Sequence, residues 1–505
     1  MEHSTIYWIV LVVFFVANLY IGYIAFKRSK SLEDFYIGGR KIGVWALAFT
    51  YVATWNSAVT YIGFPGTAYK YGMPMVASGV LSALFAGICG WMFLAQRLRD
   101  QSITLNALTI PEYIERRYQS HGARMLSTIT ILFFTGVYLV AQYAGVAYIL
   151  QLYLNLPYGT SVLIMASVIA IYTAMGGFLA VVWTDLLCGI LMTALSVFLF
   201  IFALVKLGGW HEIHYTTATL YTPEFNEIPG LMGLLMFSYL AFYTLGSLGS
   251  PQLIVRFFSI KDRTVWRKAI VLTAVVLAVQ TPFMAFLGIA TRAAELKSLI
   301  PAGVIGANTD FALPAFMIHV APMIAKILFL IGVVAASMST ANSLLLVAST
   351  AVGRDLMQQG LKMNITDKQV RFITSIAALV ITFITACLSM IKLPMVVLIS
   401  AMQLTISGAA FMPALIFGVW WKKGTKAGAL ASMTVGLVVP LLLFTVLKPY
   451  NIFGHPFWPS LILSFVTYYS VSLYTQPLPY EHVAKLFPQK NFIGDTAADS
   501  VSSGD

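Results

Sequence analysis

Apolar runs of about 20 residues recur along almost the whole chain, and their length is the strongest constraint on its fold. Of the 505 residues, 59% are hydrophobic and only 10% are charged. A bilayer offers no water to backbone N–H and C=O groups, so only helices or closed barrels can span it. Runs of this length favour helices. The sequence therefore predicts an all-α polytopic membrane protein.

The apolar runs predict thirteen transmembrane spans. They are 5–26, 45–69, 74–96, 123–153, 158–175, 178–206, 231–254, 269–291, 321–350, 369–391, 394–419, 427–447 and 457–474. Since no polar stretch is long enough for a soluble domain, we expect residues 1–475 to form a single transmembrane transporter domain. The remaining residues, 476–505, end in a small polar stretch that is typical of a disordered tail.

Lys and Arg are distributed unevenly between the loops, and this predicts the orientation of the chain. If the N-terminus lies outside, most of the 31 basic residues fall in inside loops or the tail, among them Arg40, Arg99, Arg256 and Lys422. Such an excess marks the cytoplasmic side. We therefore expect a multi-pass protein of the cell membrane with its C-terminus in the cytoplasm. The net charge of +12 then reflects topology and does not indicate a nucleic-acid partner.

Two of the predicted spans contain helix-breaking residues. The interruptions are Gly63, Pro65 and Gly66 in the second span and Gly246, Gly249 and Pro251 in the seventh. Proline removes an amide donor and glycine loosens the backbone, so both spans are expected to be discontinuous. Broken helices at corresponding places in two halves of a membrane protein are typical of the ion and substrate sites of secondary transporters.

The two broken spans also predict an internal repeat. Each opens a unit of five spans, about 45–206 and 231–419. Because five is odd, the second unit enters the membrane from the opposite side, which gives an inverted-topology repeat. The spans 5–26, 427–447 and 457–474 lie outside the repeat.

Asp185 is the one acidic residue that the predicted spans place deep in the membrane. It lies eight residues past Gly177, which puts it about 12 Å into the sixth span if this segment is helical. A carboxylate at such depth is costly and is a functional hypothesis by default. The alternative is a structural aspartate that hydrogen-bonds to a neighbouring helix end.

The ninth span is small and polar across its middle. This group comprises Ala336, Ser337, Ser339, Thr340, Ala341, Asn342 and Ser343. Residues three and four apart share a helix face, so Ala336, Ser339 and Thr340 lie together. Hydroxyl and carbonyl oxygens on one face suit a hard cation. The alternative is close helix packing, which also selects small residues.

Four motifs occur in order along the chain, namely Glu33–Arg40, Gly63–Gly72, Tyr172–Phe178 and Met338–Ser343. Through these motifs the chain resembles the sodium:solute symporter family over nearly its whole length. Within the family the chain is most similar to the sodium/pantothenate symporters, through Ala68–Gly72, Leu156–Tyr158, Ser259–Asp262 and Gly454–Pro456 with Pro459–Ser460. The resemblance implies a LeuT-type fold and sodium as the coupling ion, with no organic cofactor.

The resemblance also implies particular ion ligands. For the coupling sodium they are Ala53, Asn56, Ala336, Ser339 and Thr340. Some members of the family bind a second sodium, and Asp185, Asn342 and Ser343 match that pattern, with Asn342 replacing a hydroxyl. Proline carriers of the family have an aspartate where this chain has Trp55.

For the solute, the sequence favours a small carboxylate over a sugar. Sugar carriers of this family use a carboxylate on the third span and a Lys on the eighth, and these are absent from 73–94 and 269–290. The Arg that sialic-acid carriers use on the fourth span is absent from the apolar stretch 125–154. A carboxylate would then be held mainly by helix ends, whose amides point at anions. The residues expected around it are Trp55, Ser57, Thr60, Tyr243 and Ser247.

Together these observations predict a sodium-coupled symporter that imports a small organic solute by alternating access. A monocarboxylate such as pantothenate fits best, and a proline-type sodium/amino-acid symporter is the alternative. A passive channel or a membrane sensor ranks lower. An enzyme is not expected, since no nucleophile–base pair or metal cluster is evident. The expected partners are the solute and the lipid bilayer, and the oligomeric state is left open.

Overall fold

The computed structural model describes residues 2–228, 230–391, 396–447 and 454–487, which are almost entirely helical. The first half holds α1 (Glu2–Arg28), α2 (Leu32–Ile37), η1 (Gly38–Arg40), α3 (Val44–Trp55), η2 (Val59–Gly63), α4 (Phe64–Tyr71), α5 (Met73–Gly90), η3 (Trp91–Ala95), α6 (Gln96–Thr104), α7 (Ile110–Tyr118), α8 (His121–Leu154), α9 (Tyr158–Leu207) and α10 (Trp210–Leu220).

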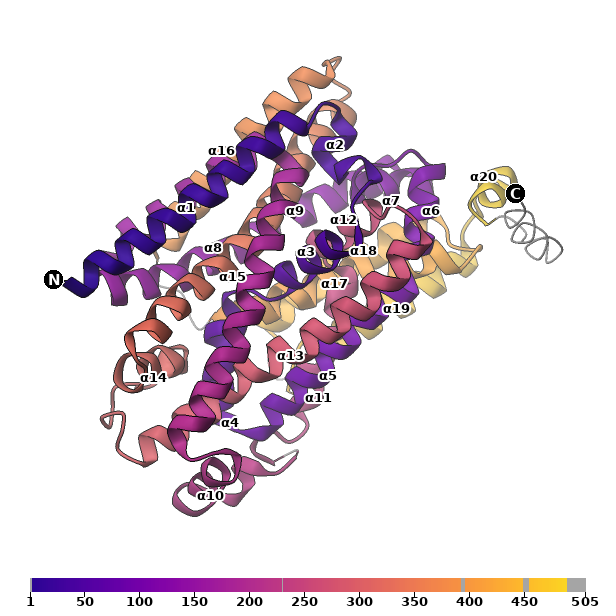
Figure 1. Cartoon of the computed structure of the whole chain (residues 1–505). Helices are drawn as coiled ribbons and strands as arrows, with labels where there is room; N and C mark the ends of the chain where they lie inside the picture. The colour runs from indigo at the N-terminus through magenta and orange to yellow at the C-terminus, as the bar shows by residue number, and fades with distance from the viewer. Residues whose placement is uncertain (1, 229, 392–395, 448–453, 488–505) are drawn as a thin grey trace, which may run out of the picture.

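The second half continues the same all-helical architecture (Figure 1). It holds η4 (Pro223–Asn226), η5 (Gly230–Met232), α11 (Leu235–Leu245), η6 (Gly246–Gly249), α12 (Pro251–Phe258), α13 (Arg263–Leu296), η7 (Thr309–Phe311), α14 (Ala312–Val320), α15 (Met323–Thr350), η8 (Ala351–Gly360), α16 (Asp367–Ser389), α17 (Val396–Trp420), α18 (Lys426–Thr445), α19 (Phe457–Tyr474) and α20 (Tyr480–Leu486). The end of the predicted tail, 488–505, lies outside the described residues.

Nine helices in the described part of the chain are long and apolar enough to cross a membrane. They are α1, α5 with α6, α8, α9, α13, α15 with η8, α16, α17 and α18. The other predicted spans coincide with α19, with the two discontinuous segments and with a second part of α9. A multi-pass membrane protein is thus supported, while the count of thirteen spans stays a prediction.

The helix α9 is too long for a single crossing. Its 50 residues would extend about 75 Å as one straight helix, whereas the hydrocarbon core is about 30 Å thick. At Gly177 the backbone leaves the helical region, with φ 56° and ψ −144°, and a Cβ there would lie 2.6 Å from the carbonyl oxygen of Phe35. Only glycine fits this bend. The helix therefore consists of two legs, which meet between the predicted spans 158–175 and 178–206.

The second predicted span is discontinuous, but its break lies earlier than the glycines and proline indicated. Helix α3 ends at Trp55, Asn56 is extended with φ −83° and ψ 114°, and helix resumes at η2. Residues Gly63, Pro65 and Gly66 lie beyond the break, inside helical structure. The π-helical turn η2 ends at Gly63, two residues before Pro65, and such local adjustments accommodate proline in membrane helices.

The seventh predicted span breaks where its sequence indicates. Helix α11 passes into the 3₁₀ turn η6, Ser250 is extended with φ −84° and ψ 109°, and α12 begins at Pro251. A Cβ on Gly249 would lie 2.3 Å from the carbonyl oxygen of Ser407, so glycine lets α17 pack against the break. Here the prediction from Gly246, Gly249 and Pro251 is confirmed.

The two broken segments run in opposite directions. Ile42, just before α3, forms an isolated parallel bridge with Ile260, just after α12, and the Ile42 amide donates to Ser259 O over 3.3 Å. The start of the first segment and the end of the second therefore lie side by side. Figure 1 places α3 and α12 toward the end of the molecule that holds α2 and α7, and α4 and α11 toward α10.

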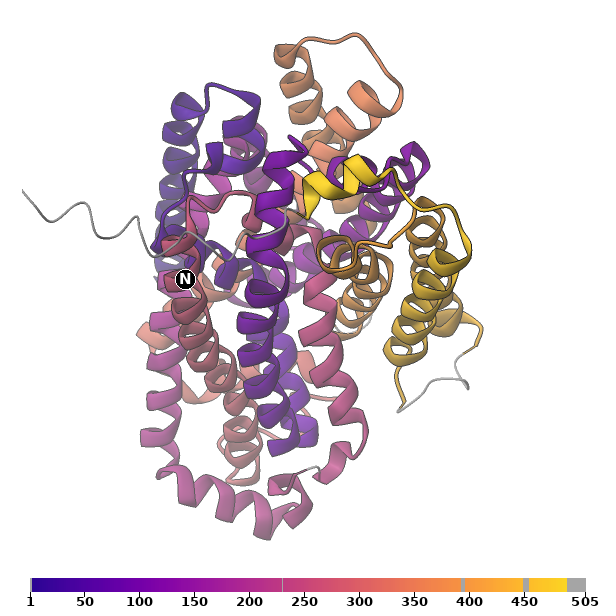
Figure 2. The same ribbon diagram turned by 90° about the vertical axis from the view of Figure 1, so that its right-hand side faces the viewer.

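The last helix of the described residues, α20, contacts the end of the molecule around α6 and α7. The Gln101 side chain of α6 donates to Leu486 O over 3.3 Å, and His482 lies 3.1 Å from Arg117 O. Figure 2 shows α20 lying along this end. By the positive-inside prediction this is the cytoplasmic end.

A buried ion pair ties α7 to the extension of α15 at this end. The carboxylate of Glu112 accepts two hydrogen bonds of 3.0 Å from Arg354 in η8, and Arg116 lies 2.6 Å from it. Burial raises the pKa of Glu112, but the charge and hydrogen bonds of Arg354, the Leu108 amide and the charge of Arg116 together outweigh burial and hold the pKa below its ordinary value. The pair therefore stabilises the folded protein at neutral pH, and this contribution is lost only when the pH falls through the lowered pKa.

We predict that Glu112→Gln destabilises the protein by about 3–5 kcal/mol, because it leaves the buried Arg354 without its counter-charge. The measurement is the apparent Tm of the purified protein in detergent at neutral pH. The matched control is Glu227→Gln, which neutralises an exposed glutamate and should leave the Tm unchanged. Equal Tm values for the two variants would contradict a stabilising role of the pair.

Candidate functional site

The hydroxyl groups of α15 contact the backbone carbonyls where α3 ends. Ser339 donates to Ala53 O over 2.8 Å and to Ala336 O over 3.0 Å. Thr340 donates to Thr54 O over 3.1 Å and to Asn56 O over 3.5 Å. The last carbonyls of a helix have no partner within it, so these hydroxyls satisfy groups that the break leaves free.

This contact brings together all five residues that were expected around the coupling sodium. Ala53 and Ala336 contribute carbonyl oxygens, Ser339 and Thr340 contribute hydroxyls, and Asn56 contributes its backbone carbonyl. All of these residues are fully buried. Neutral oxygens that converge in a buried place are suitable ligands for a monovalent hard cation. The hydroxyl hydrogens of Ser339 and Thr340 can rotate away when an ion binds.

The side chain of Asn56 points away from α15 and is fixed by α13. Its amide nitrogen donates to Gln280 Oε1 over 2.6 Å, and its oxygen accepts from Thr60 over 3.0 Å and from Thr281 over 3.1 Å. Gln280 in turn donates to Tyr61 Oη over 3.1 Å. This buried network fixes the extended residue of the break, so that its backbone carbonyl faces α15.

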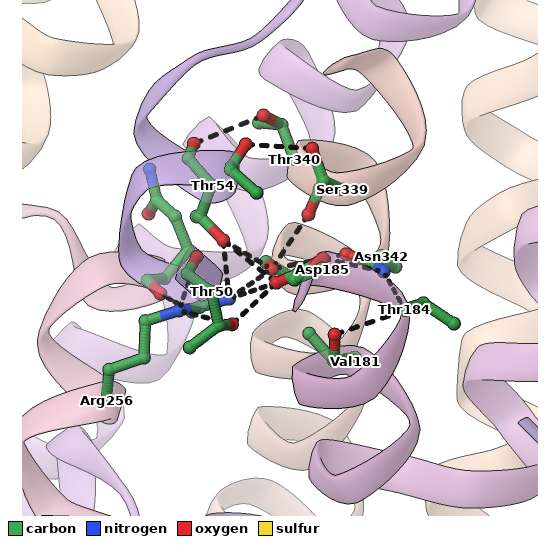
Figure 3. Close-up of polar contacts among 12 residues, drawn as sticks. Thr50, Thr54, Val181, Thr184, Asp185, Arg256, Ser339, Thr340 and Asn342 are labelled. Carbon is green, nitrogen blue, oxygen red and sulfur yellow. Dashed lines mark hydrogen bonds and ion pairs between the residues drawn. The ribbon is translucent and has the colours of Figure 1, made fainter. Parts of the chain in front are cut away.

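Asp185 is buried beside the same helices, and it is paired with an arginine. Its Oδ2 atom lies 2.9 Å from Nη2 of Arg256 on α12, and it accepts from Thr50 over 2.7 Å and Thr54 over 3.3 Å (Figure 3). The sequence had placed Arg256 in an inside loop, and this was wrong: the residue lies within α12 and its side chain is only 1% exposed. The buried carboxylate of Asp185 explains why Arg256 is buried, because burying either charge without the other would be costly.

Asn342 and Ser343 complete the surroundings of this pair. Asn342 donates to Asp185 Oδ1 over 3.3 Å, and its own oxygen accepts from Ser343 over 3.2 Å. Ser343 accepts from Arg256 Nη2 over 2.7 Å and donates to Ser339 O over 2.9 Å. The residues expected around a second sodium are thus adjacent, and the guanidinium lies among them.

The residues expected around the solute line one small cavity between the two broken segments. Its lining includes Trp55, Ser57, Thr60, Tyr243 and Ser247. The indole nitrogen of Trp55 donates to Ser247 over 3.1 Å, which joins α3 to η6. The free volume is ≈ 30 Å³, far below the roughly 300–1,000 Å³ of typical ligand pockets. In this conformation the cavity is therefore nearly closed by its own side chains.

Aromatic and amide side chains that the sequence reasoning missed also line this cavity. They are Phe64, Tyr138, Gln252 and Gln403. The hydroxyls of Ser57 and Tyr138 lie 2.9 Å apart, while the oxygens of Gln252 and Gln403 are buried without a hydrogen-bond partner in the described chain. Uncharged amides within apolar spans are the signal that would have found the two glutamines.

Comparison with known proteins agrees with this architecture. The model of the sodium:solute symporter family matches residues 35–436. A sodium/pantothenate symporter of Escherichia coli is 31% identical over 459 residues, which cover 88% of this chain and 91% of that protein. The high-affinity proline transporter PutP of Bacillus subtilis is 29% identical, over 91% of this chain and 96% of its own length.

A solved structure has the same fold. It is the substrate-bound outward-open state of a Na⁺-coupled sialic acid symporter, with a TM-score of 0.79 at 21% identity, over 94% of this chain and 98% of that one. The helical architecture agrees with this likeness, and the family match covers most of the sequence. The chain belongs to the sodium:solute symporter family, a family of membrane transporters and not of enzymes.

Proposed function

We propose that the protein is a sodium-coupled symporter that imports a small monocarboxylate of the pantothenate class by alternating access. One observation carries the sodium assignment. The carbonyls of Ala53, Thr54 and Asn56, freed by a helix break, meet the hydroxyls of Ser339 and Thr340. In membrane transporters, unwound carbonyls at such a junction coordinate the driving ion.

A bound sodium ion would link α3 and α15, which must stay together while the solute enters. The ion would bind between α3 and α15 and replace the hydrogen bonds that now join them. Inward movement of one positive charge through 100 mV supplies about 2.3 kcal/mol, enough for roughly fifty-fold accumulation of the solute. Membership of a symporter family leaves the passive channel and the membrane sensor without support.

The cavity composition supports a small carboxylate with an apolar body. Its aromatic walls, Trp55, Phe64 and Tyr243, suit a hydrocarbon segment, and no acidic side chain is among its lining residues. The unpartnered oxygens of Gln252 and Gln403 favour a solute that also carries N–H or O–H donors, since buried acceptors are costly when left unpaired. Pantothenate-type solutes offer a carboxylate and such donors together.

A proline-type symporter remains the second candidate, because a proline transporter is 29% identical to the chain. An amino acid carries an ammonium group, and the described lining offers it no carboxylate. The cavity therefore favours the monocarboxylate.

For the topology we propose thirteen spans with the N-terminus outside and the C-terminal tail, 476–505, in the cytoplasm. The opposite directions of the two broken segments support an inverted repeat of about 45–206 and 231–419. The spans 5–26, 427–447 and 457–474 would then lie outside the repeat, and residues 1–475 would form one transporter domain.

The first prediction concerns the coupling ion. Ser339→Ala and Thr340→Ala should each raise the sodium concentration needed for half-maximal uptake about tenfold, because each variant lacks one hydroxyl ligand of the bound sodium ion. The measurement is solute uptake into proteoliposomes over a range of sodium concentrations. Ser337→Ala, on the same helix but outside the site, is the matched control and should keep the wild-type value. Unchanged sodium dependence in both site variants would refute the assignment.

The second prediction concerns Asp185. Asp185→Asn keeps the shape of the side chain but leaves the Arg256 charge buried without its partner. We expect slow or poorly coupled transport in a protein that still folds. Uptake rates and thermal stability should be compared in the same preparation. A variant that is fully active and merely less stable would assign Asp185 a purely structural role.

The third prediction concerns the solute. Unlabelled carboxylates should compete with labelled pantothenate or pyruvate for uptake in sodium buffer, whereas hexoses should not, because a sugar would leave many hydroxyls unpaired in this cavity. Proline, tested beside them, decides between the two candidate solutes. Strong inhibition by hexoses with none by any carboxylate would overturn the solute assignment and leave the sodium assignment intact.

A further inference from the structure

Arg256 joins four helices through one buried guanidinium group. Its Nε atom donates to Thr50 O over 3.2 Å and to Thr50 Oγ1 over 3.1 Å, and its Nη1 atom donates to Gln252 O within α12. Its Nη2 atom lies 2.5 Å from Thr54 on α3, 2.9 Å from Asp185 on α9 and 2.7 Å from Ser343 on α15. Carbonyl, carboxylate and hydroxyl oxygens from separate helices thus surround one positive charge.

These oxygens are the ligands that a hard cation requires. Asp185 and Thr54 direct oxygen atoms at Nη2, as they would toward a metal ion (Figure 3). Ser343 does the same. The guanidinium supplies N–H groups instead, and it is bound covalently to α12. Arginine keeps its charge under all physiological conditions, so this cation is always present.

A sodium ion is poorly matched to the cluster while the guanidinium is in place. Asp185 Oδ2 already accepts from Thr50, Thr54 and Arg256, and Oδ1 accepts from the Asn342 amide. An ion at Oδ1 would meet the amide hydrogens. An added sodium would also leave two positive charges against one carboxylate in a buried place, where uncompensated charge is costly.

We propose that Arg256 is the tethered cation of the Asp185 cluster and takes the place of a second coupling sodium, so that the protein binds one sodium ion. The inference rests on the proposed function, since it takes the α3–α15 junction as the one sodium site. Arg256 acts through Asp185 and Ser343 and is a positioning residue. Because Ser343 donates to Ser339 O, the guanidinium also positions the helix turn that carries a proposed sodium ligand.

The test counts the sodium ions that the full-length protein binds in nanodiscs without any solute, using radiolabelled sodium at equilibrium. We expect one ion for the wild type. In Arg256→Gln the carboxylate of Asp185 loses its cation, and we expect two. The double variant Asp185→Asn/Arg256→Gln removes both charges and should return the count to one. Arg256→Lys keeps a tethered cation and should also bind one.

Free guanidinium ion gives a readout that a merely structural arginine would not produce. It should lower the count of Arg256→Gln from two ions to one by occupying the space that the side chain leaves, and it should not change the wild-type count. An Arg256→Gln protein that folds and still binds one sodium would overturn the proposal.

The wild-type protein alone keeps the proposal testable if Arg256→Gln does not fold. Two sodium ions bound to the wild type would overturn the inference and leave sodium symport intact. No bound sodium at all would instead overturn the proposed function, and the inference with it. One ion that is lost in the Ser339→Ala/Thr340→Ala double variant and kept in Asp185→Asn/Arg256→Gln would support both.

Discussion

A helix that stops inside a membrane leaves carbonyl groups without partners, and the arrangement of the core depends on how these carbonyls are satisfied. In this protein α15 supplies the partners, since Ser339 and Thr340 donate to the end of α3. On the other side of the break, Gln280 and Thr281 of α13 fix Asn56. Two neighbouring helices are thus positioned by one local need for hydrogen bonds, and the same oxygens are the proposed ion ligands.

Much of this architecture is local in the sequence and was therefore predictable. Apolar runs fix the long helices, and Gly177 separates two legs because only glycine adopts its backbone angles. The spacing of Ser339 and Thr340 placed both hydroxyls on one helix face, and the family resemblance implied that this face meets the break. The seventh span breaks where Gly249 and Pro251 indicated. Gly249 allows the close contact with α17, and Pro251, two residues later, lacks an amide donor.

The errors concern contacts between distant parts of the chain. The break at Asn56 is fixed by α13 and α15, so the nearby Gly63 and Pro65 misled the prediction. Arg256 was counted as a loop charge because the positive-inside rule considers only the order of residues along the chain. Its burial depends on Asp185, in another helix, and a linear pattern holds no trace of that pairing. The glutamines of the cavity were missed for another reason, because uncharged amides within apolar spans are a local signal that the prediction did not use.

The length of α15 with η8 has a mechanical consequence. Ser339 lies at the junction with α3, and Arg354 forms the ion pair with Glu112 at the end of the molecule that holds α6 and α7. The two residues lie 15 positions apart on α15 and η8, or about 22 Å at the usual rise of an α-helix. When one end of a continuous helix shifts or tilts, its other end moves as well. If sodium binds at the α3–α15 junction as proposed, a shift of α15 there would therefore also displace the pair of Glu112 and Arg354.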